Sequence, residues 1–176
     1  MPTSVTKRSS QPLGIGFVGA GMVGQVAHLA NFRDLEGCQV VALAELRPEL
    51  GRRVASRFGI EKLYKSHREL LQDDEIGAVV VVTRPQAHGP IVLDALQAGR
   101  HVLSEKPMAH SVEQATRLVE AAGHRNLRYA VGFMKRHDAG AQKAKAMLDS
   151  LRKTGELGGI VLVRAWCDGG EVRCGT

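Results

Sequence analysis

Cysteine is scarce in this sequence of 176 residues, and the few that occur form no recognisable site. The three cysteines, Cys38, Cys167 and Cys174, are odd in number and contain no Cys-x-x-Cys pair. This spacing argues against a zinc site and against a disulfide framework. Reduced thiols are typical of the cytoplasm, so we expect a cytoplasmic protein without a metal site.

Aromatic residues and long apolar runs are also few. Aromatic residues make up 4% of the chain, which is too little for a surface that stacks the bases of single strands. No apolar run approaches the length of a membrane span. Residues 1–12 lack the apolar core of a signal peptide, and we expect a disordered tail there. The net charge of +6 is spread along the chain among acidic residues, so we expect neither nucleic acid nor a membrane as a partner.

Apolar runs alternate with segments of helical periodicity from Leu13 onward. This alternation predicts βαβ units and an α/β fold with a Rossmann-type, doubly wound parallel sheet. The expected strands are Gly14–Val18, Gln39–Ala44, Lys62–Tyr64, Ala78–Val82, His101–Leu103 and Arg128–Val131. A chain of this length can bury one good core. We therefore expect a complete domain at residues 13–137 and only the start of a second, incomplete α+β domain at residues 138–176.

The periodicity also predicts which face of each helix is buried. After the first strand, the expected stripe comprises Val23, Val26, Ala27 and Ala30. In the helix that Ser111 and Gln114 cap, it comprises Val112, Ala115, Leu118, Val119 and Ala122. A later long helix presents Ala144, Met147, Leu148 and Leu151 on one side. The segment Ile160–Trp166 then reads as the first strand of the incomplete domain.

A glycine-rich turn follows the first predicted strand directly and opens the next helix. Its six residues are Gly19, Ala20, Gly21, Met22, Val23 and Gly24. Gly19 lets the chain turn, Gly21 lets backbone N–H groups approach a pyrophosphate, and Gly24 lets the helix pack close to the strand. Such a pattern alone is weak, because a tight turn that merely needs glycines has the same sequence. The surrounding strand–turn–helix–strand pattern makes it a strong indication of dinucleotide binding.

An acidic residue stands where a dinucleotide site needs one. Glu45 lies 21 residues after Gly24 and ends the second predicted strand, where a carboxylate can bind the ribose diol. A carboxylate repels a 2′-phosphate, so the sequence favours NAD as the cofactor. Arg47, two residues further on, can attract that phosphate and keeps NADP possible.

Two other segments follow predicted strands, at the edge where ligands of open α/β sheets bind. The first contains Thr83, Arg84, Pro85 and His88, and the second contains Glu105 and Lys106. Pro107 restricts Lys106, whose amine near a nicotinamide ring can move a substrate hydroxyl proton. The alternative is a surface lysine paired with Glu105. His88 lines the nicotinamide pocket in one interpretation and is an ordinary polar residue of a first helical turn in the other.

Arg136 and His137 follow the last strand of the predicted sheet. Both are candidates for substrate contacts, and both are equally compatible with exposed positions in solvent. Trp166 ends the segment that reads as a strand, and the sequence does not distinguish an active-site wall from plain core there.

The motifs together resemble the Gfo/Idh/MocA oxidoreductases, which act on sugars, inositols and related polyols with NAD or NADP. The resemblance runs from about Leu13 to Val163 and includes the segments Gly16–Gly24, Ala44-Glu45, Thr83–His88, Ala98–Pro107, Val131–Arg136 and Gly155–Gly159. It implies that Lys106 is the active-site lysine, that Thr83, Pro85 and His88 line the cofactor, and that Glu45 binds the adenosine ribose. It also implies a homo-oligomer in the full-length form.

Two departures from the family pattern affect the functional prediction. Family members continue for roughly another domain, an open antiparallel sheet that carries the usual Asp and His partners of the lysine. His137 also stands where an aromatic residue is common, and Ala139 where proline is common. We therefore predict an NAD(P)-dependent sugar, inositol or polyol oxidoreductase whose 176 residues bind cofactor without turnover. A dinucleotide sensor and an interaction protein remain the alternatives.

Overall fold

The computed structural model describes residues 11–155 and 158–164 of the chain. The expected tail at residues 1–12 lies almost wholly outside this range, as do Trp166, Cys167 and Cys174. The described chain divides into two compact units between Phe133 and Met134, a few residues before the boundary expected at residue 137. Each unit is described by itself below.

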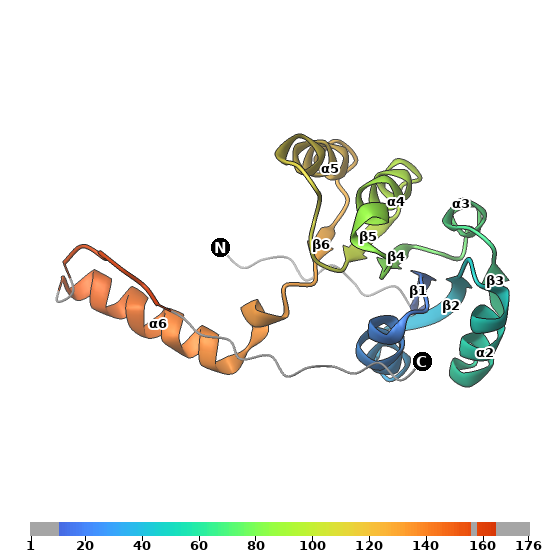
Figure 1. The fold of residues 1–176 in the computed structure, drawn as a ribbon, viewed down its shortest axis with the longest axis horizontal. Helices are drawn as coiled ribbons and strands as arrows, with labels where there is room; N and C mark the ends of the chain where they lie inside the picture. The colour runs from blue at the N-terminus through green and yellow to red at the C-terminus, as the bar shows by residue number, and fades with distance from the viewer. Residues whose placement is uncertain (1–10, 156–157, 165–176) are drawn as a thin grey trace. The chain divides into compact units, whose positions relative to one another are not determined.

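The first unit is built on one parallel sheet of six strands. Its strands are β1 (Leu13–Val18), β2 (Cys38–Ala44), β3 (Lys62–Tyr64), β4 (Ala78–Val81), β5 (His101–Ser104) and β6 (Tyr129–Val131). Their order across the sheet is β3-β2-β1-β4-β5-β6, so the chain winds outward in both directions from β1 (Figure 1). The predicted Rossmann-type fold is confirmed. β1 pairs with both β2 and β4, and this reversal of strand order is where such sheets bind ligands.

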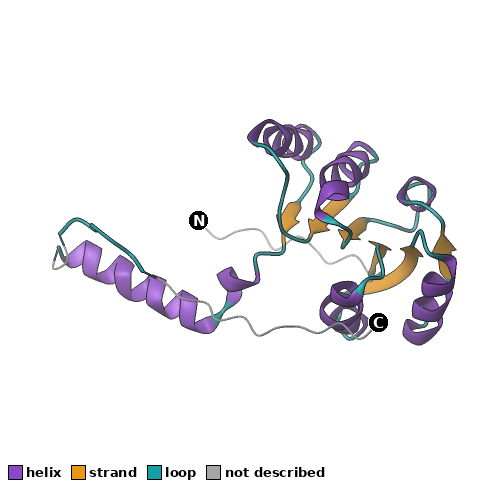
Figure 2. Ribbon diagram, in the orientation of Figure 1, coloured by secondary structure: helices purple, strands orange, loops and turns teal. Residues whose placement is uncertain are grey.

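Helices cover both faces of the sheet, as Figure 2 shows. They are the π-helix η1 (Gly24–Leu29), α1 (Ala30–Arg33), α2 (Pro48–Phe58), α3 (His67–Leu70), α4 (Pro85–Gln97) and α5 (Val112–His124). Alternate residues of β4 enter two separate cores: Val79 and Val81 pack with α3, α4 and α5, while Val80 packs with η1 and α2. Both faces of the strand are therefore buried, which explains its continuous run of valines.

The helix ends follow the local signals in the sequence. The Ser66 hydroxyl accepts a hydrogen bond from the Glu69 N–H at the start of α3, and Ser111 accepts one from Gln114 at the start of α5. Pro48 occupies the first turn of α2, and Gly59 ends it with a φ of 67°. These local predictions are confirmed.

In the first unit, two predicted helix faces are wrong in part. Val23 and Val26 are 41% and 64% exposed, whereas Gly24 and Leu29 are buried. The segment is a π-helix, whose wider turn moves a different set of residues toward the sheet. In α5, Val112 and Val119 are likewise exposed, because this helix packs on α4 beside the end of the sheet and buries only a narrow stripe that includes Leu118 and Ala122.

The second unit contains the 3₁₀-helix η2 (Met134–His137) and the helix α6 (Ala139–Thr154). The Asp138 carboxylate caps α6 by accepting the Ala141 N–H at 3.0 Å. No residue of this helix is buried, so the buried face predicted for it, Ala144, Met147, Leu148 and Leu151, is not observed within the described residues. The predicted strand at Ile160–Trp166 is wrong for residues 160–164, which are exposed and have no strand conformation. An apolar run becomes a strand only when another strand completes its hydrogen bonds. Residues 165 and 166 lie outside the described range.

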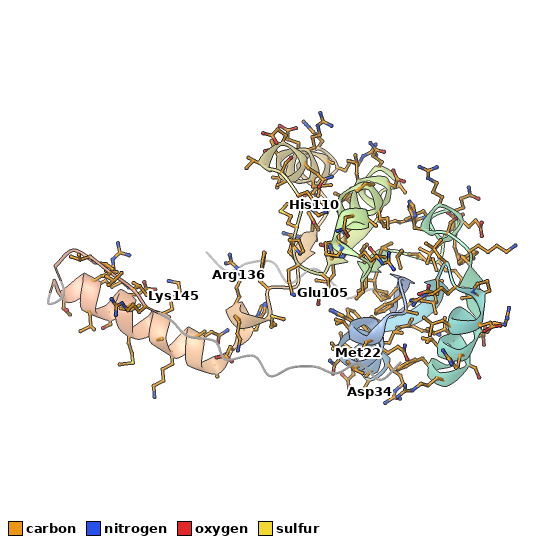
Figure 3. The ribbon with its side chains drawn as sticks, in the orientation of Figure 1. Met22, Asp34, Glu105, His110, Arg136 and Lys145 are labelled. Carbon is orange, nitrogen blue, oxygen red and sulfur yellow. The ribbon has the colours of Figure 1, made fainter. Side chains whose placement is uncertain are left out.

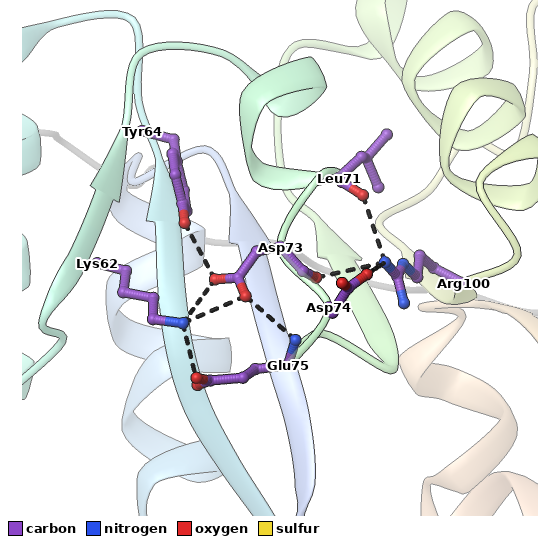
Figure 4. Close-up of polar contacts among 7 residues, drawn as sticks. All are labelled: Lys62, Tyr64, Leu71, Asp73, Asp74, Glu75 and Arg100. Carbon is purple, nitrogen blue, oxygen red and sulfur yellow. Dashed lines mark hydrogen bonds and ion pairs between the residues drawn. The ribbon is translucent and has the colours of Figure 1, made fainter.

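A polar cluster joins β3 to the loop that enters β4 (Figure 4). The Asp73 carboxylate accepts hydrogen bonds from the Lys62 amine at 2.9 Å, the Tyr64 hydroxyl at 3.0 Å and the Glu75 N–H at 3.1 Å. Hydrogen bonding from Lys62 outweighs the opposing effect of burial and holds the pKa of Asp73 below its ordinary value. The cluster lies where β4 begins, at the edge of the sheet away from the ligand-binding ends.

We expect Asp73→Asn to lower the free energy of unfolding by about 1–2 kcal/mol at neutral pH, because three donors lose a charged acceptor. Since the pKa of Asp73 is depressed on folding, the difference from the native chain should shrink as the pH falls below 3.8. Urea unfolding at several pH values measures both effects. Asp74→Asn is the matched control, because Asp74 is fully exposed and 3.6 Å from Arg100. An equal loss for both variants would contradict the assignment.

Candidate cofactor site

The glycine turn between β1 and η1 has the geometry that the sequence predicted. Gly19 has a φ of 97°, and a Cβ atom there would lie 2.2 Å from the Val82 carbonyl oxygen. At Gly24 a Cβ atom would lie 3.1 Å from the Gly19 carbonyl oxygen. A Cβ atom at Gly21 would meet no atom within 4 Å, so the backbone is open on that side. The turn is therefore closed toward β4 and open toward the ligand-binding edge.

A cavity of about 620 Å³ lies at this turn. Its walls include eight of the predicted site residues: Gly19, Gly21, Met22, Val23, Gly24, Glu45, Thr83 and Arg84. They come from the carboxyl ends of β1, β2 and β4, where the strand order reverses. Figure 3 labels Met22 at the start of the helix that follows the turn. An open glycine backbone beside a buried carboxylate, in a cavity of this size, fits a dinucleotide.

Glu45 is buried and binds the glycine turn itself. Its Oε2 atom accepts the Ala20 N–H at 2.9 Å, and its Oε1 atom accepts the N–H and the side-chain Nε of Arg47 at 3.1 and 2.9 Å. Burial alone would raise the pKa of Glu45, but these hydrogen bonds from Arg47 and Ala20 outweigh it and hold the pKa below the ordinary value. A charged acceptor therefore stands at the cavity wall at neutral pH.

Arg47, the residue expected to attract a 2′-phosphate, also lines the cavity. The wall residues that were not predicted are Val18, Ala44, Leu46, Lys65, Ser66, His67, Val82, Ala87 and Ile91. Lys65, Ser66 and His67 follow β3, and the Tyr64 carbonyl accepts the Glu45 N–H at 3.2 Å, which brings the ends of β2 and β3 together. The short strand Lys62–Tyr64 was a sufficient signal, because its carboxyl end had to lie at the same edge as the others.

Lys106 follows β5, the neighbour of β4, and its side chain is exposed. Among the residues that the structure describes, its amine has no hydrogen bond or ion pair. Glu105 instead pairs with His28 of η1, at 2.8 Å between Oε1 and Nε2. In the alternative interpretation, the pairing of Lys106 with Glu105 is therefore wrong, whereas the exposed surface position is observed. Lys106 and Glu105 do not line the cavity of the glycine turn.

His88 lies inside the protein and not on the cavity wall. It is 1% exposed, with Nε2 at 3.0 Å from the Thr83 carbonyl oxygen and Nδ1 at 3.2 Å from that of Pro107. Pro85 occupies the first position of α4 and also lies outside the wall. The family resemblance implies that both line the cofactor, and the local pattern alone left His88 open as an ordinary polar residue of the first helical turn. In the structure, His88 connects the turn after β4 to the turn after β5.

Arg136 and His137 belong to η2, the 3₁₀-helix of the second unit. The Arg136 carbonyl accepts a hydrogen bond from the Gln142 side chain at 3.1 Å, within the same unit. Their part in substrate binding remains a prediction.

The strand order, the glycine turn and the cavity at the reversal point define a dinucleotide-binding domain. The model of the Gfo/Idh/MocA oxidoreductase family, which has an NAD-binding Rossmann fold, matches residues 13–133, and the chain belongs to this family. Its predicted membership is confirmed. No helix in the described part of the chain is long and apolar enough to cross a membrane.

Similar proteins include inositol 2-dehydrogenase of Pseudomonas fluorescens, 36% identical over 142 residues that cover 80% of this chain and 42% of the relative. A solved scyllo-inositol dehydrogenase from Lactobacillus casei, with bound NAD(H) and scyllo-inositol, has a TM-score of 0.74 at 27% identity and covers 84% of this chain and 43% of that one. A 3-ketoreductase from Actinomadura kijaniata, with TDP-benzene and NADP, has a TM-score of 0.74 at 31% identity and covers 80% and 44%. The chain thus spans less than half the length of these relatives.

Two alanine substitutions in the glycine turn should have different effects. Gly19→Ala should destabilise the domain by at least about 2 kcal/mol, because the methyl group meets a backbone carbonyl in a strained conformation. Gly21→Ala should change stability by less than about 0.5 kcal/mol, since the methyl group points into open space. It should nevertheless weaken NADH binding at least about tenfold, because it fills the approach to the pyrophosphate. Thermal unfolding and NADH fluorescence titration measure both. Normal NADH binding by Gly21→Ala would show that the turn does not bind phosphate.

Proposed function

We propose that this chain is the cofactor-binding part of an NAD(P)-dependent oxidoreductase that acts on an inositol, a sugar or a related polyol. The proposal rests on two features at one edge of the sheet. The cavity lies at the glycine turn, and Lys106, whose side chain is exposed, follows strand β5 next to β4. Such sheets bind dinucleotides at this edge, and a lysine there can exchange a proton with the hydroxyl group on the reacting carbon of a substrate.

Different residues of the cavity bind different parts of the cofactor. Gly19–Gly24 and the start of η1 offer backbone N–H groups to the pyrophosphate, and Glu45 offers carboxylate oxygens to the adenosine ribose. Thr83 and Arg84 line the same cavity at the end of β4. The bound nicotinamide supplies the hydride acceptor or donor.

The Lys106 amine is the group of this chain that handles the proton. When the C–H bond of a carbinol carbon gives up its electron pair as hydride, the O–H proton passes to the neutral amine and a carbonyl group forms. In the reverse direction the ammonium returns that proton to the carbonyl oxygen. The amine has no hydrogen bond or ion pair within the described residues, which leaves it available for this exchange.

The substrate class follows from the family and from the relatives. The two inositol dehydrogenases named above act on cyclic polyols, as their names state. The proton exchange at Lys106 requires only a secondary alcohol, which inositols, sugars and other polyols all provide. Arg136 and His137 are kept as candidate substrate contacts.

Cofactor choice depends on Glu45 and Arg47 together. We expect Glu45→Gln to weaken NADH binding about tenfold, because the ribose diol loses a charged acceptor. NADPH binding should weaken less, because Arg47 is released from Glu45 and can pair with the 2′-phosphate. Fluorescence titration with both cofactors measures the ratio. Glu49→Gln, on the exposed first turn of α2, is the control. Equal losses for NADH and NADPH would contradict the role of Glu45.

Turnover is best tested in a chimera, because the relatives are more than twice as long as the region that they share with this chain. In the chimera, the remaining region of the Pseudomonas fluorescens relative follows this unit. We expect it to oxidise an inositol, and Lys106→Ala to lower kcat by about 10²–10⁴-fold without loss of NADH binding. NADH formation in a panel of inositols, sugars and polyols is the measurement. A folded chimera that binds NADH but oxidises no member of the panel would favour a cofactor sensor.

A further inference from the structure

We propose that His28 and His88 are positioning residues that hold the turn Glu105–Pro107 from its two ends and so direct the Lys106 amine toward the cofactor. The inference rests on the proposed function, because it assigns a task to Lys106. Neither histidine lines the cavity, and each binds a residue adjacent to Lys106 in the sequence.

His28 holds the turn from the side of the glycine loop. Its Nε2 atom lies 2.8 Å from Oε1 of Glu105, and both side chains are about 85% buried. The second carboxylate oxygen of Glu105 accepts the backbone N–H of Lys106 at 3.1 Å. One carboxylate therefore joins η1 to the backbone of the lysine itself. An ionised carboxylate only accepts hydrogen bonds, so the His28 nitrogen is the donor.

The π-helix gives His28 this position. The wide turns of η1 bury Gly24 and Leu29, and His28 lies between them in the sequence with its ring nitrogen 2.8 Å from Glu105, the residue that follows β5. The same helix begins in the glycine turn, where the Gln25 N–H binds the Gly21 carbonyl at 3.0 Å. The element that meets the pyrophosphate is thus the one that binds Glu105.

His88 holds the other end of the turn. Its buried ring lies between two carbonyl oxygens, that of Thr83 at 3.0 Å and that of Pro107 at 3.2 Å. Carbonyl oxygens only accept, so either tautomer of the ring donates to one of them. Thr83 is on the cavity wall, so the hydrogen-bonding positions of His88 connect the turn that contains Lys106 to the wall of the cofactor cavity.

The Lys106 side chain needs such support because no hydrogen bond or ion pair within the described residues restrains its amine. It is exposed, and a lysine stem with four rotatable bonds loses considerable entropy when it is ordered. A fixed backbone at Glu105 and Pro107 limits the volume that the amine explores. Proton exchange depends on that restriction, because small displacements of a reacting group greatly reduce its rate.

The test measures how well bound NADH shields the Lys106 amine from acylation. The extent of acylation at Lys106 in the 176-residue chain is determined by peptide mass spectrometry. With NADH at ten times its Kd, about one molecule in eleven is free, so acylation of native Lys106 should fall about tenfold. In His28→Leu the amine leaves the cofactor and the protection should fall below about twofold, although NADH still saturates the site. His28→Gln, which keeps an N–H donor for Glu105, should restore most of the protection.

The histidine in the core is tested by His88→Gln, which keeps one donor, with thermal unfolding to verify that the domain is folded. The control is His110→Gln, since His110 is exposed on the loop that follows the same turn (Figure 3). It should match the native protection, whereas His88→Gln should lose part of it.

The outcomes separate the two proposals. Failure of the native chain to bind NADH, or NADH binding that leaves Lys106 unprotected, would overturn the proposed function and this inference with it. Full protection in folded His28→Leu and His88→Gln would overturn the positioning role alone and leave the proposed function standing.

Discussion

The close contact between the glycine turn and the end of β4 is the constraint on which the rest of this site depends. At Gly19 the backbone passes so near the Val82 carbonyl that no side chain fits. That contact lets β1 and β4 pair along their whole shared length while the helices that follow them leave on opposite faces. The cavity forms where the chain segments that follow β1 and β4 diverge to opposite faces of the sheet, and the wall residues lie around that point.

Charged and polar groups around the cavity serve the fold as well as the candidate chemistry. Glu45 binds the Ala20 N–H and the Arg47 guanidinium with the same oxygens that a ribose diol would use. A cofactor at this site would therefore share or displace these contacts, and the Arg47 side chain, which is 65% exposed, is the partner that solvent reaches. Under the proposed function, the preference for NAD or NADP depends on both the buried Glu45 carboxylate and the exposed Arg47 guanidinium. Glu105 is similar, since it joins His28 to the backbone of Lys106.

Most of the first unit could be predicted from local patterns. The strand bounds agree within one residue in each case, and Ser66, Ser111, Pro48 and Gly59 end or begin helices as expected. These features depend on backbone hydrogen bonds and conformations within a few residues, which nearby side chains decide. The glycine turn and Glu45 were predictable for the same reason, because both are defined by the strand that precedes them.

Most of the predictions that failed concern contacts between distant segments. Val26 was expected on the buried face of an α-helix. The segment is instead a π-helix that exposes Val26 and brings His28 to Glu105, 77 residues away in the chain. His88 was expected at the cofactor, but carbonyl groups from two different strand ends enclose it. Ile160–Arg164 has the composition of a strand, but within the described part of the chain no strand pairs with it. The sequence by itself determined the order of elements, the glycine turn and the acid after β2, because these follow from local geometry and strand order. Only the tertiary structure decided which side chains from distant segments contact one another. These contacts depend on how the segments pack, and the separation of two segments along the chain does not determine their distance in space.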